Sequence, residues 1–306
     1  MTPRPRVSIG VPVYNGELFL PQTLDSLLAQ TYEDFELIVA DNASTDATEQ
    51  ICRAYAERDR RVVYNRSPEN RGATWNLNRL PALATCDYFK WAMADDLCSP
   101  DHLRQCVEAL DRDAGAVLAC TQTAFIDENG NPAGAPAACW DLRSESAADR
   151  LRVVIQVGGH WANADALAGV IRREAVVKTG LFPRYQGGDK RPLAELSLLG
   201  RFVEIPELLQ QRRIHSGNTG AANPAFSKKR LEQIEWMLRF FGGSRWEVVL
   251  PTWCLYVDYL GIIAGSNLRA SEKMRLAADI LRVAKWNRHY LGSELTTAFR
   301  VAVIKR

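Results

Sequence analysis

Three pairs of polar residues directly follow apolar segments of the chain: Tyr14-Asn15, Asp41-Asn42 and Asp95-Asp96. Short apolar runs that end in turn residues predict buried strands. In a sheet whose strands alternate with helices, ligands bind beyond the carboxyl ends of the strands. The pattern therefore predicts one site, at one edge of a sheet, to which all three pairs contribute.

Asp95 and Asp96 have the chemistry of a cation site. Two adjacent carboxylates at a buried strand end repel each other and lose hydration. A divalent cation offsets both effects, and hard cations prefer oxygen ligands. The same pair also suits a solvated turn, so the motif alone leaves both interpretations open.

Two further motifs could contact a nucleotide. The Asp41 carboxylate could accept a hydrogen bond from a base N–H, or form an Asx turn. Asn70-Arg71-Gly72 precedes an expected helix, whose N-terminus would suit a phosphate. It could equally be an ordinary turn.

The expected elements alternate over the first 120 residues. Strands are predicted at residues 7–13, 35–40, 62–64, 88–93 and 116–120, with helices between them. This order predicts an α/β fold with a mostly parallel, doubly wound sheet and helices on both faces. Residues 121–145 are expected to form a loop, and a helical C-terminal extension follows residue 226.

Composition excludes some classes of protein. The net charge is +2 and no block of Lys and Arg stands out, so nucleic acid is not an expected partner. The seven cysteines are scattered without a CxxC pair, which favours free thiols in a reducing compartment. No signal peptide or membrane span is expected. We therefore expect a cytoplasmic protein, soluble or peripheral at the inner face of the membrane.

Long segments of the chain resemble the family 2 glycosyltransferases, which have the GT-A fold. They are VSIGVPVYNGELFLPQTLDSLLAQTYEDFELIVADNASTD, NRGATWNLNR and YFKWAMADDLCSPDHL. The resemblance is strong over residues 6–105 and reaches residue 220 with less force. It implies a donor-binding half at 1–105, an acceptor-binding half at 106–225 and a helical region at 226–306.

The resemblance also implies roles for individual residues around a nucleotide-sugar donor and Mn²⁺ or Mg²⁺. UDP-sugar is the usual donor, with dTDP- or GDP-sugar as alternatives. The implied donor residues border the base (Pro12, Tyr14, Asn15), hold it (Asp41), or lie near the nucleotide and its phosphates (Asn70, Gly72, Asn78, Asp95). Asp95 and Asp96 would bind the metal. The first Asp of the family pattern is replaced by Met93.

The later part of the chain supplies the acceptor-side expectations. GGDKRPLAELSLLGRF resembles the family's acceptor segment, which makes Asp189 the candidate general base on a loop before a helix near residue 193. Gly188 replaces the usual Glu, and Glu195 is the alternative base or a solvated residue. His215, in RRIHSGN, could touch the diphosphate or complete the metal shell, or be structural. Trp161 and Asn163 would face the acceptor, with a core role for Trp161 as the alternative.

These expectations predict an inverting, metal-dependent sugar transfer to a hydroxyl of a glycan, a lipid-linked glycan or a small molecule. A nucleotidylyltransferase is disfavoured because VPVYNGE lacks repeated glycines and a basic residue. A sugar-nucleotide-binding scaffold with a decayed site is the non-enzymatic alternative, and the Met93 and Gly188 departures favour it. The basic, amphipathic C-terminal region predicts mainly internal packing, with peripheral membrane contact or a homodimer as alternatives.

Overall fold

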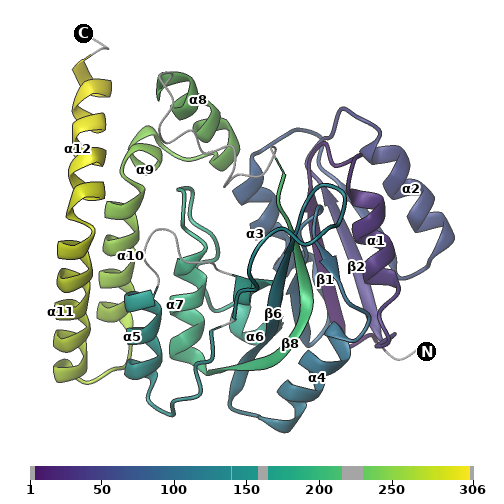
Figure 1. Ribbon diagram of the computed structural model, residues 1–306, viewed down its shortest axis with the longest axis horizontal. Coiled ribbons are helices and arrows are strands. Elements are labelled where there is room, and N and C mark those ends of the chain that lie inside the picture. The colour runs from purple at the N-terminus through teal and green to yellow at the C-terminus, as the bar shows by residue number, and fades with distance from the viewer. Residues whose placement is uncertain (1–3, 139, 158–164, 216–229, 304–306) are drawn as a thin grey trace.

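The protein is built on a single sheet, seen in a computed structural model that describes residues 4–138, 140–157, 165–215 and 230–303 (Figure 1). In these residues the sheet has eight strands in the order β3-β2-β1-β4-β7-β6-β8-β5. Their bounds are β1 Val7–Val13, β2 Phe35–Asp41, β3 Val62–Arg66, β4 Tyr88–Trp91, β5 Leu97–Cys98, β6 Ala116–Ile126, β7 Val170–Arg172 and β8 Arg201–Arg213.

The sheet is parallel in one half and mixed in the other. Strands β3, β2, β1 and β4 pair in parallel, as the alternation of strand and helix signals predicts. Beyond β4, β7 runs antiparallel to both of its neighbours, β6 and β8 are parallel, and β5 is antiparallel to β8. The α/β class is confirmed. The expected loop after residue 120 instead continues β6 to Ile126.

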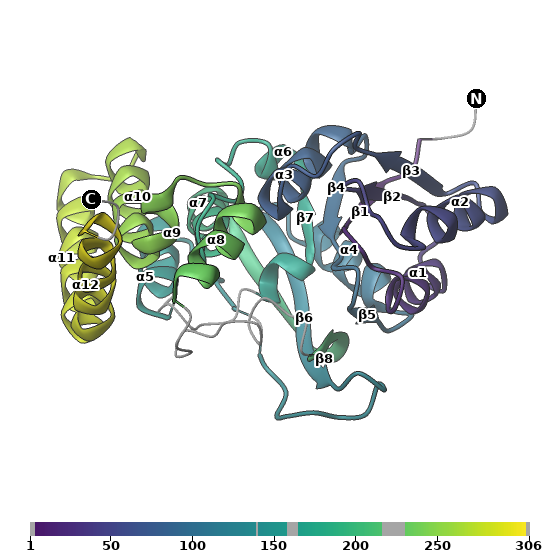
Figure 2. The ribbon, with the colours of Figure 1, turned by 90° about the horizontal axis from the view of Figure 1, so that it is seen from above.

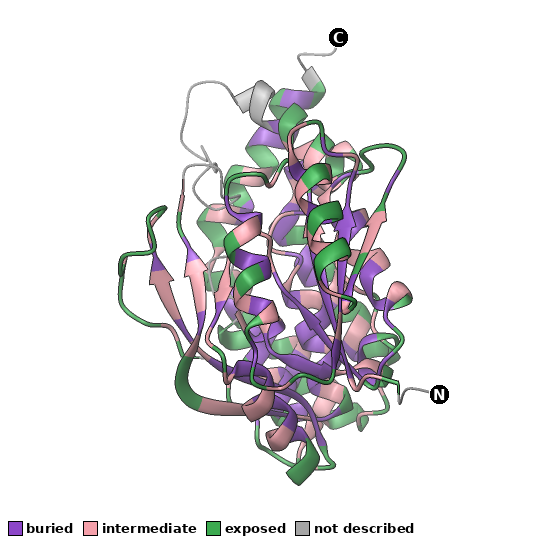
Figure 3. Ribbon diagram, turned by 90° about the vertical axis from the view of Figure 1, so that its right-hand side faces the viewer, coloured by how far each residue is buried: buried purple, intermediate pink, exposed green. Residues whose placement is uncertain are grey.

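Helices cover both faces of the sheet. Along β2, Leu37 and Val39 enter one core and Ile38 and Ala40 the other, because successive strand residues point to opposite faces. The first core is closed by α1 (Leu20–Leu28), α2 (Thr48–Arg58) and α4 (His102–Arg112). The second is closed by α3 (Ala73–Leu83), α5 (Ala147–Val157), α6 (Arg173–Val176) and α7 (Lys190–Leu199). The buried strands lie between exposed helix surfaces (Figure 3).

The C-terminal region is helical, as predicted. It comprises α8 (Arg230–Phe241), α9 (Arg245–Val249), α10 (Pro251–Gly265), α11 (Ala270–Trp286) and α12 (Arg288–Val303). Helices α10, α11 and α12 lie at the end of the molecule away from α1 and α2, whereas α8 packs on α3 (Figure 2). On α11, Leu276, Ile280 and Val283 are buried in the core that α5 and α7 also line. Internal packing is thus confirmed for this face of the helix.

The structure bears on two general expectations, one about membrane-spanning helices and one about the cysteines. None of the described helices is long and apolar enough to cross a bilayer. Cys52, Cys86, Cys98, Cys106 and Cys254 are free thiols, as expected. Cys120 on β6 is disulfide-bonded, which corrects the expectation for that residue. After β6 the chain turns back on itself, and an antiparallel bridge pairs Thr123 of β6 with Ala137.

Candidate functional site

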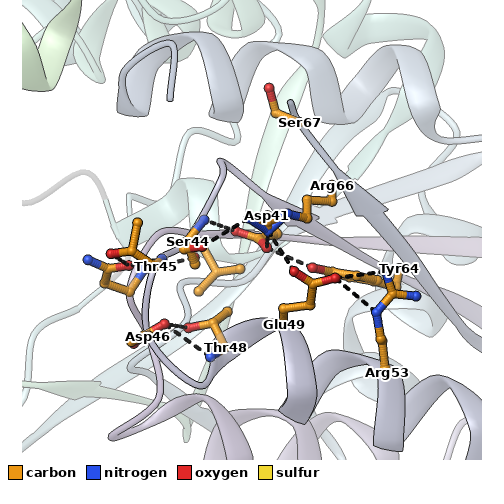
Figure 4. A network of polar contacts seen from close by, with 12 residues as sticks. Asp41, Ser44, Thr45, Asp46, Thr48, Glu49, Arg53, Tyr64, Arg66 and Ser67 are labelled. Carbon is orange, nitrogen blue, oxygen red and sulfur yellow. Dashed lines mark hydrogen bonds and ion pairs between the residues drawn. The ribbon is translucent and has the colours of Figure 1, made fainter. Parts of the chain in front are cut away.

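Asp41 ends β2 as a fully buried residue whose carboxylate is already engaged (Figure 4). Its Oδ1 accepts a hydrogen bond from the Ser44 N–H at 2.8 Å, and its Oδ2 accepts one from the Tyr64 hydroxyl at 2.7 Å. The Arg66 guanidinium lies 3.5 Å from Oδ2. In this state Asp41 holds the loop after β2, and a base would have to share one of its oxygens.

The loops after β1 and β2 are joined through Asn15. This residue has a φ of 51°, in the left-handed region that Asn tolerates better than most residues. Its N–H donates to the Ser44 Oγ at 2.9 Å, and its Oδ1 accepts from the Thr45 N–H at 2.8 Å. Tyr14 beside it is 48% exposed, and Pro12 is half-buried in β1. The exposed ring of Tyr14 adjoins these two hydrogen-bonded loops, and such a ring suits stacking on a planar base.

Asn70 and Gly72 form the start of α3. The Asn70 Oδ1 accepts from the Asn42 Nδ2 at 2.8 Å and from the Gly72 N–H at 2.9 Å. Gly72 has a φ of 86° and precedes the helix, which begins at Ala73 as predicted. The first turn of α3 therefore lies beside the loop after β2. The free N–H groups of a helix N-terminus would stabilise a phosphate there.

Asn78 is placed differently from the other predicted donor residues. Its Nδ2 donates to the Phe182 carbonyl at 2.8 Å, and its Oδ1 accepts from the Phe182 N–H at 3.0 Å. Both ends of the amide are thereby used to fasten α3 to the segment that leads to Asp189. Direct contact between Asn78 and a nucleotide stays a prediction.

Asp95, Asp96 and His215 meet just beyond β4. The His215 Nε2 lies 2.9 Å from the Asp95 Oδ2, and the Asp96 Oδ1 accepts from the Arg213 N–H at 3.0 Å. Burial, followed by the neighbouring Asp95 charge, raises the pKa of Asp96 to about 8. A divalent cation would offset both causes.

The donor set fits a cation that shares its shell with a ligand. Carboxylate oxygens and an imidazole suit Mn²⁺ or Mg²⁺. Among the described residues, no group of three or more His, Cys, Asp or Glu side chains is arranged to hold a metal. Asp95, Asp96 and His215 do not form such a group in the structure, so metal binding by them stays a prediction.

Arg213 is a site residue that sequence reasoning missed. It is 1% exposed, and its guanidinium donates to the Asp95 carbonyl at 3.0 Å and to the Gln22 Oε1 at 2.7 Å. Its backbone N–H also reaches Asp96, as described above. One buried arginine thus connects the acidic pair to α1 and to the end of β8. The sequence feature that could have identified it is its position two residues before His215, in RRIHSGN.

Asp189 lies at the start of α7, not on a loop. The helix begins at Lys190, three residues before the predicted start, because Pro192 falls in the first turn, where proline is tolerated. The Asp189 side chain makes no capping hydrogen bond. It is 40% exposed, but its Oδ1 is buried, 3.7 Å from the Nζ of the buried Lys190. The ion pair is therefore partly buried, because the Lys190 side chain is only 2% exposed.

Glu195, the alternative base, is largely buried and not solvated, and a role for it as a base stays untested. Its side chain is 18% exposed, and its Oε2 accepts from the Gly180 N–H at 2.6 Å. The Arg191 Nε lies 3.4 Å from the other oxygen. Burial raises its pKa, while these partners oppose the shift.

A second missed residue is Asp165, on the short 3₁₀ helix Asp165–Ala168. Its Oδ1 accepts from Arg212 at 3.1 Å, and its Oδ2 is buried without a hydrogen-bond partner. Burial raises the pKa of Asp165. The charge of Arg212 and its hydrogen bond lower this pKa, and the charge of Asp189 raises it. The charge of Asp165 in turn raises the pKa of Asp96. Asp165 is therefore within electrostatic range of both Asp96 and Asp189. Trp161 and Asn163 lie outside the described residues.

Comparison with known protein families identifies the family of this chain. The family model for glycosyl transferase family 2 matches residues 8–165, slightly more than half of the chain. The chain belongs to this family. The match covers the ends of β1, β2 and β4 and also Asp165.

Known proteins are similar to the chain in sequence or in fold. An uncharacterized glycosyltransferase of Methanocaldococcus jannaschii is 30% identical over 130 residues, which cover 42% of this chain and 45% of that protein. The chain thus spans less than half the length of this relative. Residues 1–349 of S. aureus TarS, solved in complex with UDP-GlcNAc, have a TM-score of 0.64 at 17% identity, covering 91% of this chain and 72% of that one.

A third similarity is to a mannosyltransferase of Pyrobaculum calidifontis solved with GDP-Man and Mn²⁺. Its TM-score is 0.52 at 20% identity, over 97% of this chain and 86% of that one. At these identities, the two structural similarities establish a shared fold, and this fold is the one the family resemblance implies.

Proposed function

We propose that this protein is an inverting glycosyltransferase that moves a sugar from a nucleotide diphosphate to an acceptor hydroxyl. The observation that carries the proposal is the presence of two carboxylate sites, one at the strand ends and one at the start of α7. Asp95 and Asp96 lie beyond β4 with the loops of β1 and β2, and Asp189 lies on α7. Asp165 couples electrostatically to Asp96 and to Asp189. This arrangement suits a leaving group at one end and a proton acceptor at the other.

In the proposed reaction, the acceptor oxygen attacks the anomeric carbon of the sugar as the bond from that carbon to the diphosphate oxygen breaks. Asp189 takes the proton of the acceptor hydroxyl through its exposed edge. The first turn of α3 stabilises the phosphates, and the joined loops after β1 and β2 hold the base. A divalent cation between Asp95, Asp96 and the diphosphate would offset the charge that develops on the leaving group.

The donor that we propose first is a UDP-sugar, with GDP- and dTDP-sugars as alternatives. TarS and the mannosyltransferase were solved with UDP-GlcNAc and GDP-Man respectively, so the shared fold accommodates both kinds of nucleotide. The Asp41 position favours uracil through the family resemblance. Residues 1–105 would bind this donor and residues 106–225 the acceptor.

The acceptor and any assembly partner belong to the proposal as classes only. A hydroxyl of a glycan, a lipid-linked glycan or a small molecule would meet Asp189. The C-terminal helices leave Met274, Leu281 and Trp286 exposed beside basic residues. This surface suits either a homodimer or peripheral contact with the inner face of a membrane from the cytoplasm.

A thermal-shift panel of nucleotide sugars with Mn²⁺ tests the proposal. We expect at least one donor to raise the unfolding temperature, because a ligand at 100 times its Kd stabilises the folded state by about 2.7 kcal/mol. The same donor should be hydrolysed slowly, with release of nucleoside diphosphate. Tight binding without any turnover would favour the scaffold alternative, and binding of no nucleotide sugar would contradict both.

Asp41→Asn tests base selection. The single oxygen of Asn would be taken by the Ser44 N–H, which leaves an amide donor where a base N–H needs an acceptor. We expect wild-type protein to bind UDP better than GDP or ADP, and the variant to lose most of this preference while remaining folded. Calorimetry with the three nucleotides gives the affinities. An unchanged preference in a folded variant would limit Asp41 to holding the loop.

A further inference from the structure

Buried polar side-chain atoms without a hydrogen-bond partner gather around the candidate base. In the described part of the chain these atoms are His102 Nδ1, Asp165 Oδ2, Asp189 Oδ1 and Tyr259 OH. The charge of Asp189 acts on both Asp165 and Tyr259, so three of the four belong to one cluster. An unpaired buried polar atom costs about 1–3 kcal/mol. Such a cluster therefore calls for an explanation.

Tyr259 reaches this cluster from the C-terminal helices. It lies on α10, is 1% exposed, and belongs to the core in which Leu193 and Leu196 of α7 are also buried. The two helices pack against each other (Figure 1). Tyr259 is therefore a buried residue of the core that α10 and α7 share.

The residue before Tyr259 fixes α10 relative to the base. The Asp258 Oδ2 accepts a hydrogen bond from the Tyr185 hydroxyl and lies 3.7 Å from the Arg191 NH1. Tyr185 and Arg191 flank Asp189 in the chain. These two contacts fasten the turn of α10 that contains Tyr259 to the chain on either side of Asp189.

The two groups lack hydrogen-bond partners and are chemically complementary, and Asp189 Oδ1 also lies 3.7 Å from the Lys190 Nζ. Burial, followed by the Asp189 charge, raises the pKa of Tyr259, so its hydroxyl keeps its proton throughout the physiological range. It is thus a permanent donor, whereas a carboxylate oxygen is an acceptor. Asp189 Oδ1 is buried although the side chain is 40% exposed, which leaves Oδ2 as the edge that solvent and substrate reach.

We infer that Tyr259 is a positioning residue for the base: its hydroxyl donates to Asp189 Oδ1, directly or through one water molecule, and turns Oδ2 toward the acceptor. This inference rests on the proposed function of Asp189. It gives the C-terminal helices a part in sugar transfer, because α10 supplies the donor. A hydrogen bond to a carboxylate favours its charged form and restricts its rotation, and both effects favour proton transfer from the acceptor.

Tyr259→Phe removes only the hydroxyl and is the test. We expect kcat for transfer to fall roughly tenfold or more, since a hydrogen bond to a charged group is lost from the reacting geometry. The KM for the donor should not change, and the acidic limb of the pH–rate profile should move to higher pH. In an Asp189→Asn background, Tyr259→Phe should have no further effect on kcat, because the two act as one unit.

Tyr256→Phe is the matched control on the same helix. Its hydroxyl is 2.9 Å from the Asn287 Nδ2. This variant also loses one buried hydrogen bond, and it should unfold at a lower temperature while keeping the wild-type kcat and pH profile. Equal losses of kcat in the two variants would overturn the inference in favour of general packing.

The remaining outcomes separate the inference from the function on which it rests. If Asp189→Asn is inactive and Tyr259→Phe has wild-type kcat and pH profile, the inference is wrong and the function stands. If Asp189→Asn transfers sugar at the wild-type rate, the proposed base is wrong and the inference fails with it.

Discussion

Asp189→Asn should transfer sugar more slowly than the wild type by a factor on the order of 10² to 10⁴, the usual contribution of a general base. The substitution preserves the shape of the side chain. It removes no capping hydrogen bond from α7, because the carboxylate makes none. Donor and metal affinity should be unchanged, because Asp189 is assigned to the acceptor side. Initial rates of transfer and calorimetric donor affinity are the measurements.

Glu195→Gln is the control for this experiment. Glu195 is on the same helix, and Gln retains an oxygen that can accept from the Gly180 N–H. Its effect on transfer should be much smaller than that of Asp189→Asn. A wild-type rate for Asp189→Asn would remove the assignment. Joint loss of donor binding and activity would instead place Asp189 in the donor site.

Asp96→Ala should nearly abolish donor hydrolysis and transfer, and excess EDTA should do the same to the wild type. The proposed cation offsets the charge on the departing diphosphate, so its loss should reduce the rate on the order of 10³-fold. Added Mn²⁺ or Mg²⁺ should restore the EDTA-treated protein but not the variant. Release of nucleoside diphosphate measures both effects.

Two further variants separate metal binding from folding at this position. Asp96→Asn keeps an acceptor for the Arg213 N–H while removing the charge, so it should fold normally and remain inactive. Asp101→Asn removes an exposed carboxylate five residues away that pairs with Arg104, and it should be nearly as active as the wild type. Full activity of the wild type in excess EDTA would contradict the metal mechanism.

Local patterns determined the first half of the sheet in advance. The apolar runs of β1, β2 and β4 and the turn residues after them predicted where these strands end, and hence that Tyr14, Asp41 and Asp95 share one edge. The glycine at position 72 likewise marked the start of α3. Such features depend on residues close in the chain, so their signals are readable without knowledge of the fold. The strands β5 and β7, with two and three residues, are too short for periodicity to reveal.

Only the tertiary structure decided what the site residues contact. Asp41 is occupied by Tyr64, 23 positions away, and the acidic pair is held by Arg213, whose guanidinium reaches the Asp95 carbonyl across 118 positions. The packing of α10 on α7 brings Tyr259 within reach of the Asp189 charge. A periodic pattern shows which side of an element is buried, but it does not show which distant element covers it. The sequence by itself thus determined the edge at which these strands end, whereas long-range packing decided how its carboxylates and the candidate base are held.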